Sequence, residues 1–161
     1  MKKGFTMIEL IFVIVILGVL ASVAIPRLAA TRDDAEVAKA ATNLTTAVSD
    51  ITAYYTAKGK FSNGESSDFT KITNALDKTG KLKVKGDKAC VEVTLPVAAG
   101  TAGATNQDKV MLSLNFKPDA DPVCKQLTKL PGILTMCGKD TTSSLSGKCE
   151  IQIGGSGGIT F

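Results

Sequence analysis

Residues Met1–Pro26, which read MKKGFTMIELIFVIVILGVLASVAIP, decide the architecture of this chain. Two lysines and Gly4 precede an apolar stretch, residues 5–25, in which Glu9 is the single charged residue. At about 1.5 Å per residue, this stretch would reach roughly 31 Å as a helix, which is enough to cross the hydrocarbon core of a bilayer. An ionised side chain inside a membrane is costly and is a functional-site hypothesis by default. We therefore expect Glu9 to have a partner.

The nearest candidate partner is an amino group created by cleavage. If the chain is cut after Gly4, the new α-ammonium of Phe5 precedes Glu9 by one helical turn, on the same face or offered to a neighbouring subunit. The run Lys2-Lys3-Gly4-Phe5-Thr6-Met7-Ile8-Glu9-Leu10, followed by an apolar helix with Gly18 and Pro26, closely resembles the prepilin signature of type IV pilins and type II secretion pseudopilins. The resemblance covers residues 2–30 and does not separate the branches of that family.

This resemblance implies a route of processing and assembly. A prepilin peptidase and methyltransferase would cut after Gly4 and methylate the new amino group of Phe5. The subunit would then wait in membrane lipid until an inner-membrane assembly platform draws it, through its N-terminal helix, into a homo-oligomeric filament. In that filament Glu9 would pair with the Phe5 amine of an adjacent subunit. The segment from Gly18 to Pro26 is the candidate for loosening on assembly.

Two other interpretations of the N-terminal segment compete with this one. In a plain signal anchor, Glu9 would snorkel near the headgroups. A cleaved secretory signal would end at a small-residue site before a turn-rich start, whereas here the apolar run reaches Ile25 and the following sequence stays helical. Lysines before the span favour a cytoplasmic N-terminus. We therefore expect an inner-membrane protein with a periplasmic head, and after assembly an extracellular filament or a periplasmic pseudopilus.

The sequence after Pro26 continues the helix. Residues 27–57 contain no Gly or Pro, and Gly59 can supply a left-handed stop. Apolar side chains recur every three or four positions and form one stripe: Val37, Ala41, Leu44, Val48, Ile51 and Tyr55. The expected division is a leader at 1–4, a transmembrane and assembly helix at 5–26, its amphipathic continuation at 27–58 and a globular head at 59–161.

The head is predicted to be a short helix followed by antiparallel strands. A cap at Ser67 or Asp68 would begin a helix over residues 69–76, closed by Gly80. Alternating or β-branched runs predict strands at 81–85, 90–95, 110–116, 133–137 and 149–153, with residues 100–103 in a loop. The last two strands would form a second hairpin. The fold class is therefore α+β: a long N-terminal helix packed by its upper half on a small antiparallel sheet, as in pilins.

The four cysteines of the chain, Cys90, Cys124, Cys137 and Cys149, all fall in the part expected to be exported. An oxidising compartment would let them form two disulfides, for which three connectivities exist. In the first predicted hairpin Cys124 can turn back to Cys90, and in the second Cys137 and Cys149 lie at the base. The hairpins therefore favour the pairs Cys90–Cys124 and Cys137–Cys149.

Two clusters of charged residues in the head have both a functional and a structural interpretation. Five lysines within eleven residues could face nucleic-acid phosphates: Lys78, Lys81, Lys83, Lys85 and Lys88. Alternatively, Lys81, Lys83 and Lys85 could form the solvated face of an edge strand. No aromatic residue is interleaved to stack on bases, so we favour the edge strand. The aspartates Asp119, Asp121 and Asp140 could bind calcium, but they lack a ligand-spaced loop and are more typical of turns.

The residue inventory argues against an enzyme. The chain has no histidine, hence no Ser-His or Cys-His pair, and no glycine-rich phosphate loop follows a predicted strand. We predict no cofactor and no metal. The expected function is that of a structural pilin subunit of a type IV filament. The alternatives are a pseudopilin of a type II secretion or DNA-uptake system and a membrane-anchored periplasmic binding module that never polymerises.

Overall fold

The computed structural model describes residues 4, 6–62, 67–96 and 109–155, apart from the side chains of residues 29 and 30. By internal contacts the chain divides into two compact units, residues 1–35 and 36–161. The helix α1, Met7–Lys58, contributes to both units. In the first unit α1 exposes its apolar side chains on every side.

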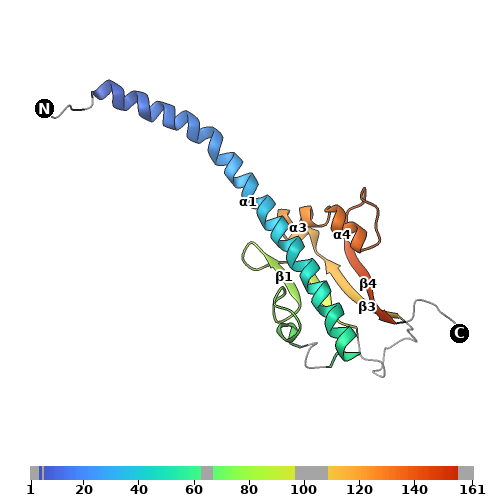
Figure 1. The fold of residues 1–161 in the computed structure, drawn as a ribbon. Helices are drawn as coiled ribbons and strands as arrows, with labels where there is room; N and C mark the ends of the chain where they lie inside the picture. The colour runs from blue at the N-terminus through green and yellow to red at the C-terminus, as the bar shows by residue number, and fades with distance from the viewer. Residues whose placement is uncertain (1–3, 5, 63–66, 97–108, 156–161) are drawn as a thin grey trace. The chain divides into compact units, whose positions relative to one another are not determined.

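The second unit, called the head below, is built on a four-stranded antiparallel sheet with the order β1-β2-β3-β4 (Figure 1). Its strands are β1, Lys81–Val84, β2, Lys88–Thr94, β3, Lys109–Phe116, and β4, Gly147–Gly155. Together with α1 they make an α+β arrangement, which confirms the predicted fold class. The strands predicted at 81–85, 90–95 and 110–116 correspond to β1, β2 and β3.

One stripe of α1 is buried in the core of the head. Its fully buried members are Val37, Ala40, Leu44, Ala47 and Ile51, spaced by three or four residues as on one helical face. The predicted stripe is confirmed with a slight rotation, because Ala41 and Val48 are only partly buried. The sheet supplies the opposite side of the core through alternate residues such as Val91, Leu112 and Leu114.

Two glycines with positive φ fix the chain at the ends of elements. Gly59, at φ 72°, ends α1, and its N–H donates to the carbonyl of Tyr55 at 2.7 Å. Gly80, at φ 76°, lies so close to its neighbours that an added Cβ would be 2.6 Å from the Phe69 ring. The predicted helix over residues 69–76 is shorter than expected, since only the 3-10 turn η1, Phe69–Lys71, forms there.

The predicted second hairpin is wrong. Residues 133–137 are not a strand, because most of them belong to the helix α4, Pro131–Met136. A second short helix, α3, Pro122–Leu127, was not predicted, and the 3-10 turn η2, Pro118–Ala120, precedes it. Both α3 and α4 begin with proline at the first helical position, where the missing N–H is harmless. The strand β4 exists as predicted, but its partner is β3, with Leu114 opposite Cys149.

Two disulfides join the segment between β3 and β4 to the sheet. Cys90 of β2 is bonded to Cys124 of α3, and Cys137, which caps the end of α4, is bonded to Cys149 of β4. These are the pairs that the predicted hairpins favoured. The second pair nevertheless closes a helix end onto a strand, so the hairpin geometry used to predict it was wrong.

Candidate assembly site of the N-terminal helix

The residues around the expected cleavage point lie at the beginning of α1. Gly4 is exposed, and an added Cβ there would meet no atom within 4 Å. Phe5, expected to become the methylated N-terminal residue after the cut, falls outside the described residues. The helix begins at Met7, which places Glu9 in its first turn.

The carboxylate of Glu9 has a partner within its own turn. Oε2 of Glu9 accepts hydrogen bonds from the backbone N–H of Thr6 at 2.9 Å and from the Thr6 hydroxyl at 2.6 Å. A glutamate at the third helical position reaching back to the N–H of the cap residue is one half of a capping box. The negative side chain is also placed favourably at the positive end of the helix dipole.

Thr6 is the residue that the reasoning from sequence missed. From the sequence, we named only the Phe5 amine as a partner of Glu9, although the spacing Thr6-x-x-Glu9 is the signature of a capping box. The consequence is that Glu9 is not an orphaned carboxylate in the single chain. A neighbouring amine would have to share or replace the Thr6 hydrogen bonds.

Around Glu9, α1 presents an apolar surface. The large side chains from Met7 to Leu28 are all exposed, with 81% of Met7 and 66% of Phe12 accessible. By length and composition this helix could cross a membrane, and it is the one such helix found in the part of the chain that the structure describes. An apolar surface of this extent requires lipid or protein around it.

Gly18 and Pro26 lie within α1, eight positions apart, and the helix continues through both. Pro26 cannot donate to the carbonyl of Ser22, because proline has no N–H. In the same turn, the Ser22 hydroxyl donates to the carbonyl of Val19 at 2.7 Å. Such a back-bond offers that carbonyl an alternative to its normal helical partner. Between Gly18 and Pro26 the described helix therefore lacks the one backbone hydrogen bond that Pro26 cannot donate.

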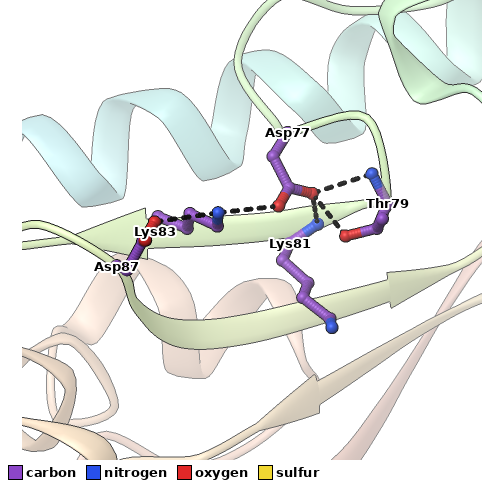
Figure 2. Close-up of polar contacts among 5 residues, drawn as sticks. All are labelled: Asp77, Thr79, Lys81, Lys83 and Asp87. Atoms are coloured by element: carbon purple, nitrogen blue, oxygen red, sulfur yellow. Dashed lines mark hydrogen bonds and ion pairs between the residues drawn. The ribbon is translucent and has the colours of Figure 1, made fainter.

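Two lysines of the cluster, Lys81 and Lys83, lie on the edge strand β1, as the structural interpretation expected, whereas Lys85 follows the strand. Lys81 and Lys83 face away from the core, whereas Leu82 and Val84 are buried. Lys83 bridges two carboxylates, with Nζ 3.0 Å from Asp87 and 3.4 Å from Asp77 (Figure 2). Lys83 therefore already has two carboxylate partners, and lysines on an edge strand discourage strand addition.

Asp77 organises the turn before β1. Its carboxylate accepts hydrogen bonds from the N–H and hydroxyl of Thr79, at 2.9 and 2.8 Å, and from the N–H of Lys81 at 2.8 Å (Figure 2). Partial burial acts to raise the pKa of Asp77, but the hydrogen bonds from Lys81 and Thr79 outweigh it and hold the pKa below its usual value. The ionised carboxylate of Asp77 therefore stabilises this turn.

The ion pairs on the surface of the head also include Lys117–Glu92, Lys78–Asp68 and Lys148–Glu150. On the sheet, Lys117 Nζ lies 2.9 Å from Glu92, and its hydrogen bond holds the pKa of Glu92 below the usual value. Lys78 Nζ lies 3.8 Å from Asp68, whose pKa is lowered chiefly by the hydroxyl of Thr70. Exposed pairs of this kind contribute little to stability.

The aspartates considered for calcium have separate places in the fold. Asp121 caps α3 by accepting from the N–H of Val123 at 2.9 Å, and Asp119 lies in η2. Asp140 follows α4 and accepts from Ser143 N–H through its backbone carbonyl. Over residues 4–155, excluding the gaps named above, no three His, Cys, Asp or Glu side chains come together as a metal site would require.

Comparison with known proteins agrees with the geometry at the beginning of the helix. The family described as the prokaryotic N-terminal methylation motif matches residues 1–25. Neither the search of curated proteins nor that of solved structures found a significant match. The matched residues contain Gly4, Thr6 and Glu9 and most of the exposed apolar helix. The chain therefore carries the N-terminal signature of type IV pilins and pseudopilins.

Proposed function

We propose that this protein is a pilin, a structural subunit of a type IV pilus-like filament. The observation that carries the proposal is the placement of Glu9 in the first turn of an exposed apolar helix that follows Gly4. A carboxylate on such a surface is expensive in lipid unless it is hydrogen-bonded or paired. A filament of identical helices supplies both an apolar environment for α1 and a cationic partner for Glu9.

The proposed mechanism has a waiting state and an assembled state. Prepilin peptidase cuts after Gly4, and Phe5 is methylated on its new amino group. While the subunit waits in the inner membrane, Thr6 satisfies the carboxylate of Glu9 through the two hydrogen bonds described above. In the filament, the Phe5 ammonium of an adjacent subunit becomes the partner of Glu9. In an apolar environment an ion pair with an ammonium is stronger than a hydrogen bond from a neutral hydroxyl, which favours the exchange.

The helix between Gly18 and Pro26 is proposed to loosen during assembly. The reason is the backbone hydrogen bond that Pro26 cannot donate there. The division into a leader at 1–4, an assembly helix at 5–26, its continuation at 27–58 and a head at 59–161 follows this mechanism. The head would occupy the periplasm before assembly and the outside of the filament afterwards. No catalytic step or cofactor is assigned to the subunit.

A pseudopilin of a secretion or DNA-uptake system is the second candidate, because the N-terminal signature is common to both branches. Imaging of filaments sheared from the surface of producing cells, labelled with an antibody to the head, separates the candidates. A pilin gives long labelled surface filaments. Label confined to the envelope would favour the pseudopilin, and a cleaved protein that forms no filament in either place would refute assembly altogether.

A further inference from the structure

The residues of α1 that follow its apolar part carry equal numbers of opposite charges. Residues 27–34 read RLAATRDD, with two arginines, two aspartates and no aromatic residue. At about 1.5 Å per residue, Met7 and Arg27 are about 30 Å apart along α1, which is the thickness of the hydrocarbon core of a bilayer. When α1 crosses a membrane, Arg27 therefore lies where the hydrocarbon core meets the headgroups.

Arg27 shares one face of α1 with Asp34. Seven residues are close to two full helical turns, so the two residues lie in line, about 10.5 Å apart along the helix axis. Both are exposed. The headgroup layer of a bilayer is roughly 5 to 8 Å deep on each side of the hydrocarbon core. Arg27 and Asp34 therefore bracket this layer, with the cation at its inner boundary and the carboxylate at its outer boundary.

Neither of these two side chains has an ionic partner within its own chain. Ion pairs along a helix join residues three or four positions apart, and Arg27 and Asp34 are seven apart. Within the part of the chain that the structure describes, neither makes an ion pair. Thr31, between them on the same face, donates its hydroxyl to the carbonyl of Leu28 at 3.0 Å. This face of α1 therefore presents one cation and one anion to the headgroup layer.

We propose that Arg27 and Asp34 bind the headgroup of a zwitterionic aminophospholipid such as phosphatidylethanolamine. The guanidinium of Arg27 binds the phosphate, and the carboxylate of Asp34 accepts a hydrogen bond from the primary ammonium. Two charge-assisted contacts of about 3 Å each, together with the two-carbon link of the headgroup, span a length close to the separation of the two residues. The phosphate is attached to glycerol and lies deeper than the amine, which is the order of Arg27 and Asp34 along α1.

The charges of this segment favour an aminophospholipid over two other headgroups. An anionic phospholipid without an amine offers no donor to Asp34, whose negative charge repels it. A quaternary choline has no N–H to donate to a carboxylate and is typically held by aromatic side chains, which residues 27–34 lack. The inference rests on the proposed function only for placing α1 in a membrane before assembly.

Native mass spectrometry of the full-length protein in detergent micelles tests the site. The micelles contain equal amounts of phosphatidylethanolamine, phosphatidylcholine and phosphatidylglycerol with the same acyl chains, and the lipids that stay bound are identified by mass. The wild type should retain about fivefold more phosphatidylethanolamine than phosphatidylcholine, as expected for one additional charge contact at a membrane surface. Arg27→Gln should lower the retention of phosphatidylethanolamine about fivefold.

Variants at position 34 separate a specific contact from a general effect of charge. Asp34→Asn should remove the preference for phosphatidylethanolamine, and Asp34→Glu should keep it, because glutamate restores the carboxylate. The matched control is Arg32→Gln, which removes the same charge as Arg27→Gln at a position about 140° around the helix from Arg27 and should keep the preference. Circular dichroism should show the same helix content in every variant, so that a lost preference does not reflect unfolding.

Three results would overturn the proposal. They are equal retention of phosphatidylethanolamine and phosphatidylcholine by the wild type, stronger retention of phosphatidylglycerol than of phosphatidylethanolamine, and a preference that survives Asp34→Asn. These outcomes are separable from the proposed function. A protein that shows the lipid preference but forms no filament overturns only the pilin assignment, and a protein that forms filaments without the preference overturns only the lipid site.

Discussion

The two disulfides should contribute unequally to the stability of the head. We consider two double variants, Cys90→Ala with Cys124→Ala and Cys137→Ala with Cys149→Ala, in which no free thiol remains. The first pair closes a sequence separation of 34 residues and the second one of 12. In the chain-entropy model, these loops correspond to about 3.8 and about 2.8 kcal/mol of stabilisation at 25 °C.

The burial of Cys90 and Cys124 increases the expected difference in stability loss between the two variants. Cys90 and Cys124 are 1% and 0% exposed, whereas Cys137 is only partly buried. Truncating both buried sulfurs leaves a cavity in the core, which adds on the order of 1 kcal/mol or more for the first pair. We expect the variant lacking Cys90–Cys124 to lose roughly 4 to 6 kcal/mol and the variant lacking Cys137–Cys149 roughly 3 kcal/mol.

Urea unfolding of the full chain in detergent micelles measures this difference. The chain has no tryptophan, and its two tyrosines, Tyr54 and Tyr55, both pack on Phe61, so tyrosine fluorescence reports on the head. Free energies extrapolated to water should be compared, because the slope with urea changes when a cross-link is removed. Equal losses, or a larger loss on removing Cys137–Cys149, would refute the argument from loop length and burial.

Three further predictions concern processing, assembly and pH. Gly4→Leu should leave the leader attached and block filament formation, because a bulky residue before the cut cannot enter the peptidase site; a mature mass without residues 1–4 would contradict this. The Glu9→Ala variant should be inserted, cleaved and folded normally but should polymerise poorly. Thr6→Val should lower the filament yield less than Glu9→Ala does, and Thr6→Ser should give a yield near that of the wild type. Quantitative blotting of sheared filaments measures these yields, and a Thr6→Val yield at or above wild type would remove Thr6 from the mechanism. Asp77 has a lowered pKa, so its contribution is present above the ordinary aspartate pKa of about 3.9 and is lost as the pH falls through its lower folded value; Asp77→Asn should weaken the acid dependence of unfolding, and an unchanged pH profile would count against this assignment.

Much of the head could be predicted because its signals are local. The stripe of α1 follows the helical period, Gly59 stands where a left-handed residue ends the helix, and β1 alternates lysine with buried Leu82 and Val84. The strand at 110–116 was also predicted, since apolar Leu112, Leu114 and Phe116 alternate with polar residues, and such alternation indicates a strand without knowledge of its neighbours.

The candidate site was predicted in part. Gly4, Glu9, Gly18 and Pro26 were recognised from their order in the sequence, since a lone carboxylate in an apolar run is visible without a structure. The hydrogen bonds from Thr6 to Glu9 required the geometry of the first turn, because a threonine three residues before a glutamate signals a cap only where the helix begins.

The N-terminal signature, the extent of α1 and its buried stripe follow from the amino-acid sequence alone, because each depends on residues within a few turns of one another. The region between β3 and β4 instead depends on contacts between distant parts of the chain. The short apolar run at residues 133–137 is compatible with a strand or a helix, and in the structure most of it belongs to α4. With no strand there, β4 pairs along the free edge of β3, and Cys149 meets Cys137 at a helix end. A strand pairs with the sheet edge that remains free after the rest of the core has packed. Which edge is free depends on the whole fold, so it cannot be read from a short stretch of sequence.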